Sequence, residues 1–222
     1  MNPPYGGTEK KSVQQNFPTE LRNSETADLF MVEILYRLKE NGRVGIVLPD
    51  GFLFGTDNTK VAIMKKLMEE CNLHTIIRLP GSIFAPYTSI ATNLLFFDKT
   101  GPTEETWFYR MDLPEGYKAF SKTKPVELKH LQPIIEWWNN REEIKDEKED
   151  ESLTETWKSK KYNLSEITLN NYNLDLCGYP QKEEIILSPK ETMEKFITKR
   201  EKLEKQLDDK LNEIIKIIGD IK

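Results

Sequence analysis

Residues 42–54 read GRVGIVLPDGFLF and contain the clearest strand signal of the sequence. Arg43 to Leu48 forms a short run that is apolar on both faces, and Pro49-Asp50-Gly51 stops it. A strand that is buried on both faces shows continuous rather than alternating apolar residues, so this run is typical of a central parallel strand. We therefore expect an α/β sheet built around it.

A helix is expected on each side of this strand. Apolar residues recur at helical spacing from about Ser24 to Glu40, and Asn41-Gly42 is a stop signal. A second helix is expected from about Asn58 to Cys71, followed by a strand from His74 to Leu79. This alternation of helix and strand indicates a mostly parallel sheet.

The following segments depart from that alternation. A strand from Ser89 to Phe97 comes too soon for a long helix, so we expect an antiparallel strand pair at one side of the sheet. Residues 104–111 can add a further edge strand. Residues 116–188 are expected to form a mixed extension, with a helix from about Leu131 and an irregular segment over Tyr162 to Tyr179.

The last part of the chain is unlike the rest. From Pro189 to Lys222 there is no internal proline, and Gly219 is the only glycine, so we expect one long helix. Its apolar residues follow a 3-4 spacing, which suits a helix folded on its own domain and a helix paired with another chain equally well. The sequence thus predicts three parts, 1–115, 116–188 and 189–222.

Charge is unevenly distributed in this acidic chain. The 222 residues are 37% apolar and 31% charged, with a net charge of −5. Residues 141–151 hold three basic and seven acidic side chains, which is four of those five negative charges, and we expect a solvated helix end or a disordered loop there. A protein that binds DNA without a partner usually has a positively charged surface. If DNA is the substrate, another subunit or further chain supplies much of the electrostatic attraction.

Cysteine and histidine usage argues against a metal site. Cys71 and Cys177 have no Cys or His at metal-ligand spacing, and two cysteines make no disulfide framework, so a reducing cytoplasm fits best. His74 and His130 stand alone, and we expect them to be structural or surface residues. No run of about 18 apolar residues occurs and the chain starts with polar and proline residues, so neither a membrane span nor a signal peptide is expected.

The clearest chemistry is carried by Asn2-Pro3-Pro4-Tyr5. The Asn2 side-chain oxygen and the Pro3 carbonyl can accept hydrogen bonds from both N–H groups of an amino nitrogen, which favours a more nucleophilic nitrogen. The prolines fix φ and supply no donor, and the Tyr5 ring can stack on a base rotated out of its duplex. The same residues also fit a polyproline II ligand of a small recognition domain, and the motif alone leaves both interpretations open.

The context of the motif points to one family. The motif, a helix over 29–38, the segment 42–54 and the turn Ile77-Arg78-Leu79-Pro80 follow in this order. Together they resemble the modification subunits of type I restriction-modification systems, which are N-6 adenine-specific DNA methyltransferases.

Later segments extend the resemblance. Ile83-Phe84 and Thr88 to Phe97 look like that family's next strand pair, and Tyr172-Asn173-Leu174-Asp175 resembles its Tyr-Asp-Leu segment with Asn173 as a departure. The likeness is strong over residues 1–115 and weak over 160–180.

The resemblance implies a fold and roles for residues. The fold would be the C-terminal half of a Rossmann-like class I methyltransferase sheet, followed by an irregular extension and a long helix. Asn2 and Pro3, with Pro4 completing the motif, would hold the adenine amino group, and Tyr5 would stack on the flipped base. Gly6 to Pro18 would be a mobile loop near that base. Phe17 would anchor the loop, with a second stacking contact as the less favoured alternative.

The methyl donor implied by the family is S-adenosylmethionine, usually held by a glycine turn. No Gly-x-Gly occurs in the sequence, and in the family that turn lies upstream of the motif, where only Met1 stands here. Asp28 and Asp50 could be offered as ribose ligands, but each sits naturally at a helix start or a strand end. We therefore expect the chain alone to lack a competent cofactor pocket and to be inactive.

The resemblance also implies partners: DNA, a specificity subunit that reads it and a restriction subunit. Two other functions stay open. The motif also occurs in methyltransferases that act on protein glutamine or on RNA bases, although residues 42–54 favour DNA. The chain could also be a non-catalytic assembly module whose terminal helix docks on the specificity subunit.

Overall fold

The computed structural model of this protein describes residues 1–55, 57–147, 154–180 and 188–219, apart from some side chains of the last helix. The chain divides into two compact units, Met1–Gln181 and Lys182–Lys222. The first unit holds every described strand and the second holds one long helix.

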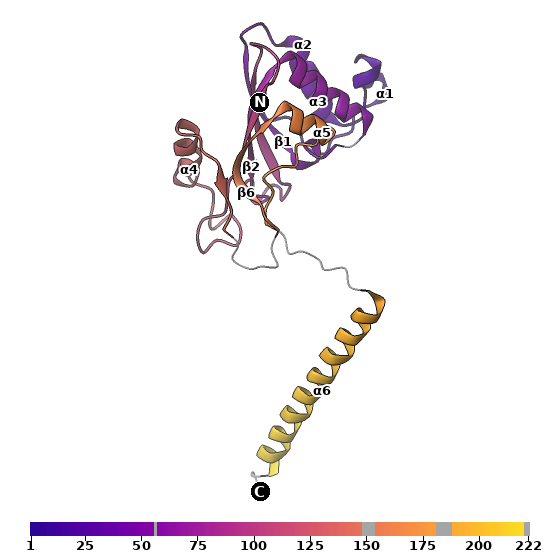
Figure 1. Ribbon diagram of the computed structural model, residues 1–222, viewed down its shortest axis with the longest axis vertical. Coiled ribbons are helices and arrows are strands. Elements are labelled where there is room, and N and C mark those ends of the chain that lie inside the picture. The colour runs from indigo at the N-terminus through magenta and orange to yellow at the C-terminus, as the bar shows by residue number, and fades with distance from the viewer. Residues whose placement is uncertain (56, 148–153, 181–187, 220–222) are drawn as a thin grey trace. The chain divides into compact units, whose positions relative to one another are not determined.

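One six-stranded sheet forms the centre of the first unit (Figure 1), with its strands in the order β1-β3-β2-β4-β6-β5. The strands are β1 (Arg43–Pro49), β2 (Asn72–Leu79), β3 (Thr92–Asp98), β4 (Glu105–Arg110), β5 (Ile144–Lys145) and β6 (Trp157–Asn163). β2 and β4 pair in parallel, whereas the other four neighbouring pairs are antiparallel. The expected α/β fold, with an antiparallel strand pair and a C-terminal helix, is confirmed. The sheet is less parallel than expected, because β3 runs antiparallel between β1 and β2 and only the β2–β4 pair is parallel among the named strands. β1 was expected to be a central parallel strand, but it stands at the end of this strand order and pairs antiparallel with β3.

The insertion of β3 aligns the ends of its neighbours. Because β3 is antiparallel to both β1 and β2, these two strands and β4 all run in one direction. Thr92, the first residue of β3, stands opposite Pro49 of β1 and opposite Leu79 of β2, and Arg78 stands beside Arg110 of β4. We call the side of the sheet where β1, β2 and β4 end the carboxyl edge.

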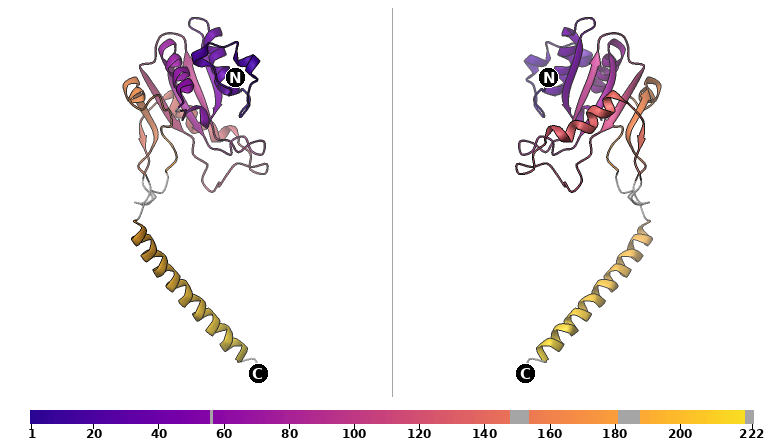
Figure 2. Two further views of the ribbon diagram at one scale, coloured as in Figure 1. Left: turned by 90° about the vertical axis from the view of Figure 1, so that its right-hand side faces the viewer. Right: turned by 90° about the vertical axis from the view of Figure 1, so that its left-hand side faces the viewer.

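Helices cover both faces of the sheet (Figure 2). α2 (Thr26–Arg37), α3 (Asn58–Glu70) and α5 (Leu164–Leu169) pack on one face, and α4 (Leu128–Asn139) covers the other. Ile76 belongs to the core of the first face and Ile77 to that of the second, because successive strand residues point to opposite sides. The expected helices around 24–40 and 58–71 are confirmed within three residues at each end.

Local signals explain where these helices begin and end. The Asp57 carboxylate caps α3 by accepting hydrogen bonds from the backbone of Thr59 at 3.1 Å and Lys60 at 3.0 Å. After α2, Asn41 takes a left-handed conformation with φ of 60° just before Gly42, as a helix stop signal requires.

The expectation of an edge strand over 104–111 is wrong. The strand exists as β4, but it lies inside the sheet between β2 and β6, and Phe108 is fully buried. The outer partner is β6, which comes about fifty residues later and is rich in lysine.

The irregular segment expected over 162–179 is partly regular. Its first residues end β6, and α5 follows, begun by Asn163 and Glu166 in a capping box. Beyond α5 the chain is irregular and is held by the buried side chains of Leu174 and Cys177.

The acidic block 141–151 is described only up to Glu147, and its remainder lies outside the described residues. Ile144–Lys145 forms β5, and Asp146 accepts hydrogen bonds from Arg110 at 2.7 and 3.0 Å. Within this half, Glu142 and Glu143 follow the end of α4 and are exposed, as expected for a solvated helix end. Ile144–Lys145 belongs instead to the sheet, so this part is neither a helix end nor a disordered loop.

The second unit contains α6 (Pro189–Gly219), as expected for residues 189–222. Phe196, Leu203 and Leu207 lie on it with exposed fractions of 62%, 55% and 60%. Among the described residues, no helix combines the length and apolar character that crossing a membrane requires.

Candidate active site

The Asn2–Tyr5 motif leaves the sheet at its carboxyl edge. The terminal amine of Met1 donates to the Gly45 carbonyl at 2.7 Å, and the Val47 amide donates to the Met1 carbonyl at 3.0 Å. These two bonds place Met1 beside Ile46 in the pattern of a parallel pair. The chain from Met1 therefore runs in the direction of β1, and the motif follows toward the end where β1 also stops.

Within the motif the residues have different surroundings. Pro3 is buried, whereas Asn2 and Pro4 are exposed and Tyr5 is half-buried. The Tyr5 hydroxyl donates a hydrogen bond to Asn2 Oδ1. Burial raises the pKa of Tyr5, so its hydroxyl keeps its proton at neutral pH and remains a donor. The Asn2 acceptor is thus presented at the surface, held by the neighbouring ring.

Phe84 provides a second aromatic ring at this place. Its centroid lies 6.3 Å from that of Tyr5, with 40° between the two planes. Stacked bases are roughly 3.4 Å apart, so a base between two rings needs about 7 Å. A small opening and a rotation toward parallel planes would make the gap between Tyr5 and Phe84 fit one base.

Phe84 is not among the site residues expected from the sequence. It lies in the loop after β2, and β2 is separated from β1 only by β3. The rule that ligands bind outside the carboxyl ends of strands could have drawn attention to an aromatic residue there. The sequence does not show that β1 and β2 lie on either side of β3, and this strand order is what brings Phe84 close to the motif.

Gly6 to Pro18 is more structured than the expected mobile loop. Residues 7–9 lie antiparallel to the start of α2: Thr8 bridges Glu25, and the Thr26 amide donates to the Gly7 carbonyl at 3.0 Å. A short helix, α1 (Lys11–Gln14), follows. The backbone just after the motif is therefore fastened to α2.

Glycines at positions 6 and 7 permit this close approach. Gly6 has φ of 67°, which favours glycine, and a Cβ at Gly7 would collide with the Thr26 hydroxyl.

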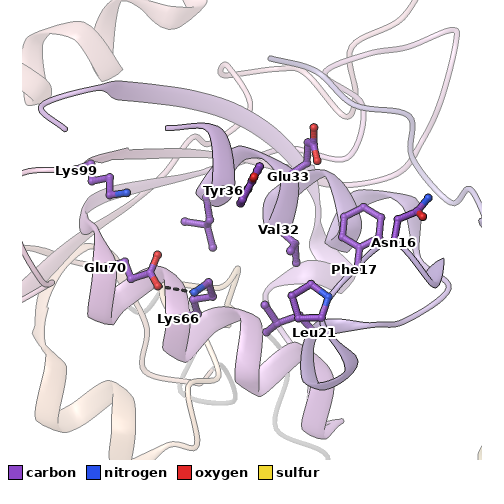
Figure 3. A pocket seen from close by; sticks show the side chains of 11 residues that line it. Asn16, Phe17, Leu21, Val32, Glu33, Tyr36, Lys66, Glu70 and Lys99 are labelled. Carbon is purple, nitrogen blue, oxygen red and sulfur yellow. Dashed lines mark hydrogen bonds and ion pairs between the residues drawn. The ribbon is translucent and has the colours of Figure 1, made fainter. Parts of the chain in front are cut away.

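Phe17, the less favoured stacking candidate, lies elsewhere. Its ring packs against the core cluster on the α2 and α3 face, and its carbonyl accepts a hydrogen bond from Arg22 Nη2 at 2.9 Å. Phe17 also lines a hollow of about 740 Å³ (Figure 3), whose walls come from the loop before α2, from α2 and α3, and from Lys99. No residue of the Asn2–Tyr5 motif lines this hollow.

A buried charge pair lies where α2 begins. Asp28 is fully buried; its Oδ2 accepts from Asn23 and is 3.9 Å from Lys60 Nζ, while Oδ1 has no partner. Lys60 Nζ also donates to the Gly51 carbonyl at 3.0 Å and lies 3.5 Å from Glu25. Burial raises the pKa of Asp28 to about 6, against the opposing effect of Lys60.

The two aspartates considered as ribose ligands are both engaged within the protein. Asp28 is enclosed as described, and Asp50 accepts hydrogen bonds from Asn93 Nδ2 at 2.8 Å and from Arg78 Nη2 at 3.3 Å. The Asp50 and Asp28 carboxylates thus have structural roles. Neither aspartate is therefore free to bind a ribose in the way considered from the sequence, which also has no Gly-x-Gly turn.

Two buried arginines attach the segment after α5 to the carboxyl edge. Arg78 donates to Asp175 and, at 3.3 Å, to the Leu176 carbonyl. Arg110 donates to the Gly178 carbonyl at 2.7 Å. Residues 172–175, which show the weaker part of the family resemblance, are therefore fixed beside Asp50.

Neither histidine lies at the motif. His74 packs edge-on against Trp138, and burial lowers its pKa, with the Arg141 charge adding to the effect. His130 closes the capping box of α4. Within the part of the chain that the structure describes, no three Cys, His, Asp or Glu side chains are grouped so that they could hold a metal ion.

Comparison with known proteins gives a consistent result. The model of the N-6 DNA Methylase family matches residues 1–186. The chain is similar to the EcoEI type I restriction enzyme methylase subunit of Escherichia coli, with 44% identity over 96% of this chain and 42% of the relative. The chain thus spans less than half the length of that protein.

Solved structures show the same likeness. A structure of a type I restriction-modification system matches 97% of this chain and 44% of its own chain, with 30% identity and a TM-score of 0.70. The M protein of the type I enzyme EcoKI, whose methylase subunit comes from Escherichia coli K12, matches 83% of this chain and 43% of its own, with 27% identity and a TM-score of 0.62.

Replacing Asp28 by asparagine should flatten the pH dependence of stability between about pH 4 and about pH 6. Its folded pKa of about 6 lies above the ordinary value of 3.8, so in this window the folded chain binds a proton that the unfolded chain lacks. The free energy of unfolding therefore falls as pH rises, by about 2 to 3 kcal/mol at roughly 1.36 kcal/mol per pKa unit.

Urea unfolding of the wild type and the Asp28→Asn variant, at about pH 4.5 and about pH 7, measures this difference. Glu33→Gln is the control, because Glu33 is a partly exposed carboxylate on the same helix. Equal pH slopes for the wild type and Asp28→Asn would contradict the prediction.

Proposed function

The chain belongs to the N-6 DNA methylase family, and on that basis we propose that its Asn2–Tyr5 motif is the target-base site of a DNA adenine-N6 methyltransferase. The observation that carries this proposal is the pairing of an exposed Asn2 acceptor with an aromatic ring at the carboxyl edge. That edge is where open α/β sheets bind their ligands.

The chemistry of the site follows from its acceptors. Adenine N6 is planar and poorly nucleophilic because its lone pair is conjugated with the ring. Asn2 Oδ1 and the Pro3 carbonyl can each accept one of its two N–H groups, which favours a more tetrahedral nitrogen. Pro3 is buried, so its backbone is held in place when the base arrives.

The free chain has Asn2 Oδ1 occupied by the Tyr5 hydroxyl. An incoming adenine amino group must take over this acceptor, and the Tyr5 ring can then stack on the base. We assign the opposite stacking surface to Phe84, because its ring centroid lies 6.3 Å from that of Tyr5. Both phenylalanines are partly buried against a core cluster, but Phe17 packs against the cluster on the α2 and α3 face, while Phe84 packs against the one on the α4 face. The base would then lie between two aromatic rings.

S-adenosylmethionine is the methyl donor that the family implies, and it supplies the transferred methyl group when bound. The two candidate ribose ligands, Asp28 and Asp50, are engaged internally, and the sequence has no Gly-x-Gly turn to hold the donor. We therefore assign to this chain the recognition of the base, and we expect the chain alone to transfer no methyl group.

A second function is favoured by the apolar stripe of α6. Phe196, Leu203 and Leu207 lie at helical spacing and are exposed. An exposed stripe of this kind is typical of a helix that pairs with a partner. The chain would dock through α6 on the specificity subunit of a type I system, which would read the DNA sequence and, with the restriction subunit, complete the assembly.

Substitutions in the motif separate the roles of hydroxyl, ring and amide. Tyr5→Phe keeps the ring and frees Asn2 Oδ1, so methyl incorporation should stay within about threefold of the wild type. Tyr5→Ala should lower kcat/KM about ten- to a hundredfold through lost stacking, and Asn2→Ala about a hundredfold or more through the lost acceptor.

The measurement is transfer of a labelled methyl group to duplex DNA by the complete methyltransferase that contains this chain. Tyr36→Ala, which removes another exposed tyrosine on α2, is the control and should leave kcat/KM unchanged. An unaltered rate for Asn2→Ala would rule out the proposed role of the amide.

The chain by itself should not bind S-adenosylmethionine, because neither a glycine turn nor a free ribose ligand is available. Isothermal titration calorimetry of the purified chain should show no binding heat. A well-defined isotherm with one site per chain would refute this prediction and show that the described residues do fit the donor.

Removal of residues 189–222 should abolish association with the specificity subunit. Because a deletion can act indirectly, Leu203→Asp with Leu207→Asp is the sharper variant, since it puts two charges on the apolar stripe. Lys205→Asp changes charge off the stripe and serves as the matched control. Size-exclusion chromatography of the mixed subunits reports the outcome; an elution profile that is unchanged for the stripe variant would exclude α6 as the docking helix.

A further inference from the structure

The loop between β2 and β3 carries an exposed aromatic residue on a fixed backbone. The Tyr87 side chain is 93% exposed. Its backbone amide, however, donates to the Phe84 carbonyl at 2.9 Å, so the Tyr87 backbone is tied to the residue whose ring faces Tyr5.

Further contacts hold this loop in one shape. The Ile83 amide donates to the Pro80 carbonyl at 2.9 Å, and the Ile83 side chain is buried in the core on the α4 face. The Ser82 hydroxyl accepts from the Phe120 amide at 2.9 Å. At the base of the loop, a Cβ on Gly81 would lie 3.2 Å from the Ser89 carbonyl oxygen, so the two ends of the loop meet. The loop is compact and well anchored, and yet the Tyr87 side chain at its tip is exposed.

Rotating a base out of a duplex leaves two costs unmet. The neighbouring bases lose their stacking contacts, and the partner base loses its hydrogen bonds. Side chains that enter the stack can offset the first cost, and large apolar groups do so in DNA-bending proteins. An aromatic ring stacks on any base and has few rotatable bonds to immobilise.

The loop tip fits this task in its chemistry as well as its place. Ile90, in the same loop, is 44% exposed and adds apolar surface near the tip. Contact with the uncharged interior of a base stack needs no positive charge, which suits a chain with a net charge of −5.

We propose that Tyr87 enters the DNA duplex beside the target adenine and stacks in the space that the flipped base leaves. This inference deepens the proposed function and rests on it. Tyr5 and Phe84 hold the flipped base, while Tyr87, three residues from Phe84 along the same loop, fills the gap in the stack. The same anchored loop thus supplies Phe84, which contacts the flipped base, and Tyr87, which contacts the base stack that the flipped base has left.

Two DNA substrates distinguish this role from a structural one. In the first, the target adenine is paired with thymine; in the second, the complementary strand lacks the nucleotides opposite the target adenine and its two neighbours, so the adenine can leave without opening a gap between stacked base pairs. The assay measures kcat/KM for both with the complete methyltransferase that contains this chain. Tyr87→Ala should lower kcat/KM about tenfold on the paired duplex and leave the gapped substrate nearly unchanged. Tyr87→Phe should match the wild type on both substrates.

Tyr36→Ala is the matched control, because Tyr36 is 85% exposed on α2 and lines the hollow away from the motif. Equal losses for Tyr87→Ala on both substrates would overturn the inference, since a distorted loop would affect both. If the wild type is active and Tyr87→Ala has the same kcat/KM on the paired duplex, the inference about Tyr87 is wrong while the proposed function stands. A wild-type enzyme that methylates neither substrate would overturn the proposed function and this inference together.

Discussion

The antiparallel insertion of β3 between β1 and β2 is the constraint on which the site depends. Backbone hydrogen bonds on both sides of β3 fix the register of its neighbours, so Thr92 stands opposite the ends of both strands. The motif beside β1 and the Phe84 loop after β2 therefore leave the sheet at one level. The contact between Tyr5 and Phe84, which are 79 positions apart, follows from this register and from no local signal.

The parts of the fold that depend on local sequence could be predicted. α2, α3 and β1 follow from apolar periodicity and from the stop signals at Asn41-Gly42 and Pro49-Asp50, because these features act within a few residues. The position of β4 inside the sheet could not be predicted, because its outer neighbour is β6 and the sequence of β6 shows no apolar alternation. In the structure, the Lys160 ammonium lies 5.2 Å and 4.8 Å from the ring centroids of Trp157 and Tyr162. The aliphatic part of a lysine side chain can cover aromatic surface, but in the sequence a lysine-rich strand resembles a solvated segment.

The candidate site shows the same division. The Asn2–Tyr5 motif became a candidate through the chemistry of its residue types together with the family resemblance of the segments that follow it. Phe84 did not become a candidate, because only the strand order brings it to the motif. Residues 6–18 are polar and without apolar periodicity, so a mobile loop was expected there, yet Gly7 allows the close approach to Thr26 that fastens this segment. A glycine can mark tight packing as well as freedom.

The carboxyl edge also holds the last described residues of the segment after α5. Buried guanidinium groups need several acceptors to offset the loss of water. Arg78 finds them in Asp50 and Asp175, and Arg110 in Asp146 and the Gly178 carbonyl. Since Asp50 follows β1 directly, the end of the motif's neighbouring strand and the segment after α5 share one hydrogen-bonded cluster. Residues 175–178 are therefore held at the carboxyl edge by Arg78 and Arg110, the first of which also binds Asp50 at the end of β1.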